Sequence, residues 1–164
     1  MTTLNSFLEI DPSIIRSNIQ KLKNKTSKPL NFMAVVKSDS YGHILNNLAS
    51  DIDDLVDGYG VVRLDEATNL RKVSNKKILL MQGVYSQEDF LLAKEHNLDL
   101  VVHNQHQLKI IIDNKNFNNL WFKVNTGMNR LGFEEDEFLK IYDEYLKDLN
   151  FTLMTHLASS NNKE

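Results

Sequence analysis

The chain has 164 residues, of which 41% are hydrophobic and 25% charged, a composition typical of a globular domain with its own core. A formal net charge of −3, with lysines and acids interspersed, gives no basic patch of the kind that binds nucleic acid or an anionic membrane. The chain has no cysteine, which excludes disulfides and thiolate metal sites, and no signal-like N-terminus or membrane-length apolar run. We therefore expect a cytoplasmic protein without nucleic-acid, membrane or metal partners.

The N-terminal quarter of the chain predicts two strands separated by a helix. Residues 7–10 form a short strand-like apolar run that closes on an Asp-Pro pair. Asp11 is a good N-cap and proline suits the first helical position, so a helix is expected over 12–23. The apolar run 32–36 contains two adjacent valines and predicts a buried strand that ends at Lys37.

Strands and helices then alternate at a spacing of roughly 20 to 30 residues. Further strands are expected over 58–62, 77–82, 98–103, 120–124 and 151–156, and helices over 43–55, 64–73, 86–97, 104–113 and 134–146. Such alternation specifies βα units and a parallel sheet.

Two architectures fit this alternation, an open doubly wound sheet and a closed (β/α)8 barrel. The first would carry a glycine-rich phosphate fingerprint in an early βα turn, which is missing from the sequence. Polar side chains follow nearly every strand, and in a barrel such strand ends gather at the mouth where catalytic sites lie. They are Lys37, Arg63, Gln82, His103, the segment after Val124, and His156. We therefore predict a TIM-barrel type α/β fold, incomplete because about five βα units and a sixth strand stand where eight units are needed.

The first candidate site is Lys37 with the loop that follows it, within FMAVVKSDSYGH at 32–43. A lysine just beyond an apolar strand can be partly desolvated, which lowers its pKa and frees the amine to form a Schiff base with a carbonyl. Gly42 allows close backbone approach, and the Tyr41 hydroxyl can donate a hydrogen bond to an anion. The alternative is a solvated lysine at a strand end, which is the commoner situation for this stretch taken alone.

The second candidate site is WFKVNTGMNRLGF at 121–133. Its strand leads into a loop in which Arg130 lies between two glycines. A guanidinium held on such a loop suits a phenolate or carboxylate oxygen, to which it gives charge-assisted hydrogen bonds. An ion pair between Arg130 and Glu134 or Glu135 is an equally good interpretation of this stretch alone.

Both stretches carry a family resemblance. AVVKSDSYGH resembles the cofactor-lysine motif of the alanine racemases, usually AVVKANAYGHG, and WFKVNTGMNRLGF resembles their second signature, KxDTGMxRLGF. GYGVVRLDEATNLR, DLVVHNQHQL and LMTHLASS resemble other segments of the same family, in the correct order. The resemblance implies that residues 1–164 are a partial N-terminal barrel domain that binds pyridoxal phosphate. The remaining barrel units and the family's C-terminal β-domain are absent.

The resemblance also implies a role for each matching residue. Lys37 is the lysine that forms a Schiff base with pyridoxal phosphate and acts as the base on one face of the substrate α-carbon. Tyr41 contacts the cofactor phosphate, while Arg130 binds the cofactor's phenolic oxygen and the substrate. Lys123 matches a position that is carbamylated in many members. His156 matches a catalytic histidine that polarises the tyrosine base of the opposite face.

The implied activity is the pyridoxal-phosphate-dependent interconversion of L-alanine and D-alanine, which supplies D-alanine for peptidoglycan, in a full-length homodimer. Asp39, Ile44 and Asn125 depart from the family's usual Asn, Gly and Asp without removing a named catalytic group. The tyrosine base belongs to the half that is absent, so the 164 residues alone are expected to be inactive. The alternatives are an inactive pyridoxal-phosphate-binding module or remnant, and a racemase for serine or another amino acid. Single-domain pyridoxal-phosphate homeostasis proteins share the barrel but lack both signatures in this form.

Overall fold

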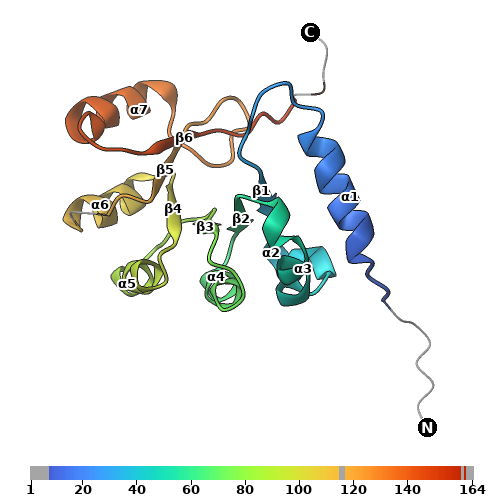
Figure 1. Ribbon diagram of the computed structural model, residues 1–164. Coiled ribbons are helices and arrows are strands. Elements are labelled where there is room, and N and C mark those ends of the chain that lie inside the picture. Colours follow the sequence, from blue (N-terminus) through green and yellow to red (C-terminus); the bar gives the residue numbers. More distant parts are fainter. Residues whose placement is uncertain (1–7, 115–116, 160, 162–164) are drawn as a thin grey trace.

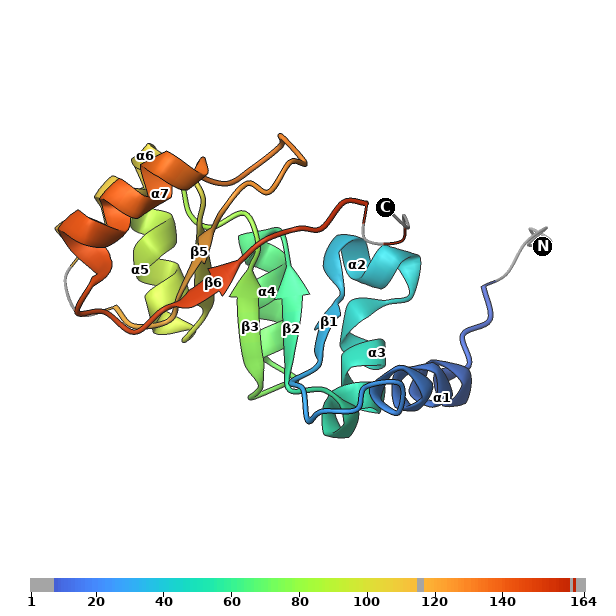
Figure 2. The same ribbon diagram turned by 90° about the horizontal axis from the view of Figure 1, so that it is seen from above.

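The strands form one parallel sheet in which spatial order follows chain order. The structure is a computed structural model that describes residues 8–114, 117–159 and 161. Its sheet has six strands in the order β1-β2-β3-β4-β5-β6, curled into a half-barrel (Figure 1). They are β1 Met33–Val35, β2 Gly58–Val61, β3 Lys77–Leu80, β4 Asp99–Val102, β5 Leu120–Lys123 and β6 Thr152–Met154. Strands β1, β2 and β3 stand side by side in Figure 2. The predicted TIM-barrel type fold, incomplete at six strands, is confirmed.

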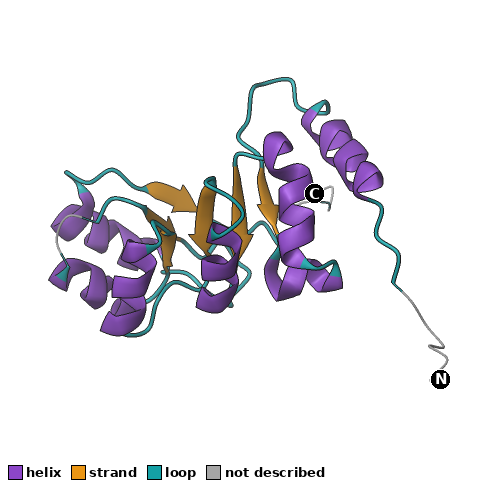
Figure 3. Cartoon of the chain, turned by 60° about the horizontal axis from the view of Figure 1, so that its bottom comes forward, coloured by secondary structure: helices purple, strands orange, loops and turns teal. Residues whose placement is uncertain are grey.

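Helix α1 precedes the first strand, and the other helices connect successive strands and pack along the outer side of the sheet (Figure 3). They are α1 Pro12–Lys23, α2 Lys37–Gly42, α3 Leu45–Ile52, α4 Leu64–Arg71, α5 Gln87–Glu95, α6 Gln105–Asp113 and α7 Glu135–Ile141. A 3₁₀ turn at Asp53–Leu55 extends α3, and a π-helical turn at Tyr142–Leu146 extends α7. None of the described helices is long and apolar enough to cross a bilayer.

Side-chain caps fix where several helices begin. Asp11 accepts a hydrogen bond from the backbone N–H of Ser13 at 2.9 Å, directly before the proline that opens α1. Ser86 and Asn104 cap α5 and α6 in the same way. Each cap satisfies a backbone donor that the first helical turn leaves unpaired. The predicted starts of these three helices follow from this local chemistry.

The core lies between the sheet and its helices. Strands β2 and β4 are buried along their whole length, and the largest fully buried side chains include Tyr59, Phe90, Phe122 and Phe133. Tyr59 places its hydroxyl 3.0 Å from the backbone oxygen of Ala49 in α3, so its polar end is satisfied inside the core. Burial raises the pKa of the Tyr59 phenol.

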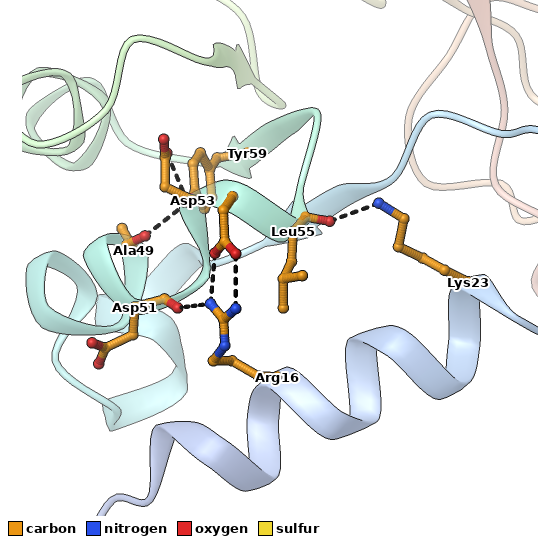
Figure 4. A network of polar contacts seen from close by, with 8 residues as sticks. Arg16, Lys23, Ala49, Asp51, Asp53, Leu55 and Tyr59 are labelled. Atoms are coloured by element: carbon orange, nitrogen blue, oxygen red, sulfur yellow. Dashed lines mark hydrogen bonds and ion pairs between the residues drawn. The ribbon is translucent and has the colours of Figure 1, made fainter.

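Helix α1 is fastened to the α3 region by two basic side chains (Figure 4). The Arg16 guanidinium donates to the Asp54 carboxylate at 2.7 Å and to the backbone oxygen of Asp51 at 2.6 Å. Lys23 donates to the backbone oxygen of Leu55 at 2.9 Å. The bidentate pair is largely exposed, so it fixes the direction of α1 more than it stabilises the fold.

The structure corrects several details of the predicted elements. Residues 8–10 form no strand, and residue 7 of that prediction lies outside the described residues. Strand β1 is not buried, since it is an edge strand and Val35 is 42% exposed. The helix predicted over 43–55 begins only at Leu45, because Ile44 has a left-handed backbone, and the helix over 134–146 ends in the π turn. The strands stop one or two residues before their predicted ends.

Candidate active site

The predicted site residues lie at the carboxyl edge of the sheet. Lys37 follows β1 after one residue, Lys123 is the last residue of β5, and His156 lies two residues beyond β6. In a parallel sheet these ends share one edge, which is the catalytic face of barrel folds. At this edge the residues form two groups. One is Lys37 with Tyr41, after β1, and the other is Lys123 with the segments that follow β5 and β6. No hydrogen bond or ion pair joins the two groups within the described part of the chain.

The loop after β1 is a single left-handed helical turn, labelled α2. Ser38, Asp39, Ser40 and Tyr41 have φ between 52° and 58°, and none of them is glycine. For L-residues this conformation costs roughly 1–2 kcal/mol each. Such strain persists only where the surroundings hold it, and it clusters at active sites and ligand clamps.

Hydrogen bonds hold the turn from both ends. At its start, the backbone N–H of Ser38 donates to the Glu66 carboxylate at 2.6 Å. At its end, the backbone N–H of Leu45 donates to the Asp39 carboxylate at 2.7 Å, which ties the turn to α3. Within it, the backbone N–H of Ser40 donates to the oxygen of Val36 at 3.0 Å. These bonds offset the backbone strain.

The turn sets Lys37 beside Tyr41. The Lys37 ammonium lies 6.0 Å from the centre of the Tyr41 ring, at the limit of a cation–π contact. Lys37 is half-buried and Tyr41 is 62% exposed, so the amine and the phenol both face an accessible space. A Cβ added at Gly42 would meet nothing within 4 Å, which leaves room beside the turn. The predicted burial of strand β1 does not occur. Lys37 is nevertheless half-buried and not a freely solvated lysine.

Lys123 occupies a much drier position. Its side chain is buried at the end of β5, and burial lowers the pKa of its amine, with a further lowering from the nearby Arg130 charge. Both effects favour the uncharged amine. An uncharged lysine is a nucleophile, so this position is chemically suited to modification.

The Arg130 loop is organised by Asn125. The side-chain oxygen of Asn125 accepts hydrogen bonds from the backbone N–H groups of Gly127 at 3.1 Å and Asn129 at 3.0 Å. Its amide nitrogen donates to the Glu134 carboxylate at 2.7 Å. Arg130 is exposed and forms no ion pair with either Glu134 or Glu135. The ion-pair interpretation of this arginine is therefore wrong, and its guanidinium faces solvent at the sheet edge.

The segment that carries His156 is joined to the same loop. The Thr155 hydroxyl donates to the backbone oxygen of Val124 at 3.0 Å and lies 2.6 Å from the Thr126 hydroxyl. His156 itself is exposed. The two threonines thus bring the ends of β5 and β6 together at the edge where Arg130 lies.

A buried polar cluster lies between these two groups, at the ends of β3 and β4. The His103 Nε2 atom lies 3.2 Å from the backbone oxygen of Gln82, and Gln107 donates to that same oxygen at 2.6 Å. The Asn104 amide faces the other ring nitrogen at 3.3 Å. Burial lowers the pKa of His103, which favours the neutral ring. In the sequence, His103 and Gln82 stand out only as polar residues at strand ends. The signal that could have revealed the cluster is Gln107, which follows His103 by about one helical turn.

Glu66 is the second residue that the sequence did not single out. It lies in the first turn of α4, where an acidic residue three positions after Arg63 indicates only a helix cap. Its bond to Ser38 crosses from one βα unit to another, which no local pattern reveals.

Comparison with known proteins identifies the family of this chain. The family described as alanine racemase, N-terminal domain, matches residues 10–164. The chain belongs to this family. It is 35% identical over 159 residues to the alanine racemase of Shewanella sediminis, covering 92% of this chain and 43% of the relative.

Two solved alanine racemases share the fold. The biosynthetic enzyme of Pseudomonas aeruginosa is 28% identical with a TM-score of 0.83, over 94% of this chain and 45% of that one. The enzyme of Bartonella henselae, solved with covalently bound pyridoxal phosphate, is 22% identical with a TM-score of 0.80, over 92% and 44%. The chain therefore spans less than half the length of the alanine racemases it matches. The family is pyridoxal-phosphate dependent.

Proposed function

We propose that this chain is the cofactor-lysine portion of an alanine racemase, which interconverts L-alanine and D-alanine with pyridoxal phosphate. The observation that carries the proposal is the strained turn after β1, which sets the half-buried Lys37 amine beside the Tyr41 phenol. In this proposal residues 1–164 supply the N-terminal part of the barrel. The closing barrel units and a C-terminal β-domain lie outside them, in a cytoplasmic homodimer that supplies D-alanine for peptidoglycan.

The residues around Lys37 fit such a cofactor. A half-buried amine suits covalent attachment to an aldehyde, and no atom lies within 4 Å of a Cβ added at Gly42, so the turn is open beside the amine. Tyr41 is accessible and can donate its hydroxyl hydrogen to a phosphate oxygen. When bound, pyridoxal phosphate stabilises the negative charge that develops on the substrate α-carbon.

In this proposal, each of three residues of the chain has its own role in the reaction. Lys37 holds the cofactor and, once its amine is free, takes or returns the α-proton on one face. Arg130, which no described acidic side chain neutralises, donates to the cofactor's phenolic oxygen and to the substrate. His156 assists the base of the opposite face, which lies outside residues 1–164.

Lys123 supports Arg130 in this proposal. An uncharged, buried amine reacts with carbon dioxide to form a carbamate and release a proton. The carbamate would be an anion that accepts hydrogen bonds from Arg130, whereas the unmodified amine repels Arg130 whenever it is protonated. Arg130 would then keep its direction without an ion pair to Glu134 or Glu135.

The test is to locate the covalent attachment. The chain is incubated with pyridoxal phosphate, reduced with borohydride, digested and mapped by mass spectrometry. The pyridoxyl group is expected on Lys37, and Lys37→Ala should abolish the label while Lys23→Ala leaves it unchanged. A label spread over surface lysines, or one concentrated elsewhere, would refute the assignment. If the chain is labelled at Lys37 but the complete parent protein does not exchange the α-proton of alanine, the racemase proposal is wrong. The chain would then be a cofactor-binding module only.

A further inference from the structure

One carboxylate joins the ends of the first two βα units. An oxygen of Glu66 accepts from the backbone N–H of Ser38 at 2.6 Å, in the turn after β1. The other oxygen accepts from the backbone N–H groups of Arg63 at 3.0 Å and Val62 at 3.2 Å, in the turn after β2. Glu66 is half-buried and its bond to Val62 is partly buried, whereas its bonds to Ser38 and Arg63 lie at exposed positions.

The bond to Ser38 completes a clamp around Lys37. On one side, the backbone N–H of Val36 donates to the oxygen of Gly60 in β2 at 2.9 Å. On the other side, the backbone N–H of Ser38 donates to Glu66. The backbone on both sides of Lys37 is therefore attached to the neighbouring βα unit. Because the left-handed turn begins at Ser38, this second attachment also holds the first strained residue.

We propose that Glu66 is a positioning residue for Lys37, whose carboxylate holds the left-handed turn and thereby fixes the amine that receives the cofactor. The inference rests on the proposed function of Lys37. Glu66 does not touch the amine, since no ion pair joins the two within the described residues. It acts on the backbone one residue away, and a carboxylate suits this task because both of its oxygens accept and neither donates.

A role in helix capping alone would be the competing explanation. The bonds to Val62 and Arg63 are local to the start of α4, whereas the bond to Ser38 spans 28 residues. Glu66→Asp separates the two roles because a shorter carboxylate can still cap the helix but cannot reach Ser38. Glu66→Gln keeps the length but places an N–H₂ group against one set of backbone donors. Asp65→Asn is the matched control, since Asp65 pairs with Arg63 in the same turn and, among the described residues, forms no hydrogen bond with Ser38.

The experiment measures cofactor attachment and amide exchange on the full 164-residue chain. Attachment, in which the Lys37 amine condenses with the aldehyde and water leaves, is followed by titration with pyridoxal phosphate, monitored by visible absorbance. Hydrogen exchange of the Ser38 amide is followed in parallel, and helix content by circular dichroism. Losing a hydrogen bond to a charged group is expected to raise the dissociation constant about tenfold or more in both Glu66 variants. Ser38 exchange should accelerate by a similar factor, while Asp65→Asn matches the unmodified chain.

The outcomes distinguish a failure of the Glu66 inference from a failure of the proposed function. If the unmodified chain attaches the cofactor at Lys37 and both Glu66 variants bind it equally well, this inference is wrong while the proposed function stands. If Ser38 exchange accelerates but the dissociation constant does not change, Glu66 holds the turn without positioning the lysine, and the inference is again overturned. If the unmodified chain is not labelled at Lys37, the proposed function fails and the inference fails with it.

Discussion

Gly83 offers a quantitative test of how the end of β3 is built. Its φ is +65°, and a Cβ added there would lie 2.1 Å from the backbone oxygen of Val101 and 2.8 Å from the amide nitrogen of Gln107. In Gly83→Ala, the left-handed backbone costs about 1–2 kcal/mol. The clash with Val101 involves main chain that no rotamer change relieves, and forced overpacking typically costs about 1–3 kcal/mol more. The total expected loss is therefore about 2–5 kcal/mol.

Gly127→Ala is the matched control for this substitution. Gly127 also has a positive φ, +106°, but a Cβ there would meet nothing within 4 Å. Its backbone cost is at least as large, because +106° lies outside the left-handed region that L-residues reach, but it lacks the steric cost. Gly83→Ala is nevertheless expected to lose more, since overpacking against the Val101 backbone adds about 1–3 kcal/mol. Urea unfolding of both variants at one protein concentration gives the difference from the shift in midpoint. Equal losses, or a smaller loss for Gly83→Ala, would refute the steric argument.

Three further predictions concern ion pairing, the Arg130 loop and the sheet edges. Hydrogen bonding to Arg16 lowers the pKa of Asp54, so this carboxylate stabilises the fold above its ordinary pKa of 3.8 and the contribution is lost as the pH falls through its lowered value. The stability difference between the chain and Asp54→Asn should accordingly shrink in acid and in high salt, and a constant difference would contradict the pairing. Asn125→Asp replaces a donor 2.7 Å from the Glu134 carboxylate with a second anion, so the melting temperature should fall and added salt should recover part of the loss. Because β1 and β6 each have one unpaired side among the described residues, the 164 residues alone should self-associate in light scattering. They should also not racemise alanine, and a stable monomer with full turnover would show this to be wrong.

The alternation of strands and helices could be predicted because each element is specified locally. An apolar run followed by a polar residue marks a parallel strand and its catalytic end, as Lys37 after β1 and His103 after β4 illustrate. Ser86 and Asn104 could be recognised as helix caps because capping depends on the residue and its near neighbours. The parallel sheet and the edge that holds the candidate site follow from these local signals.

The exposure of β1 could not be predicted, because it depends on what stands beside the strand. The apolar run 32–36 has the composition of a buried strand, yet Val35 is 42% exposed. In the described residues β1 pairs only with β2, and β6 only with β5, so one side of each stays open. A strand's own residues specify that it is extended and apolar. They do not specify which neighbour covers it.

The left-handed turn is the clearest limit of local inference, and it is also the feature on which the candidate site depends. Ser38 and Tyr41 carry no signal for positive φ, and Gly42, which does, is only the last residue of α2. The conformation is held by Asp39 bonding to α3 and by Glu66 reaching across from α4. Both are tertiary contacts that a strained backbone requires and that no short window of sequence contains. A lysine that must stay in one place is therefore fixed by residues far from it in the chain, which is why its chemistry can be predicted from its neighbours while its position cannot.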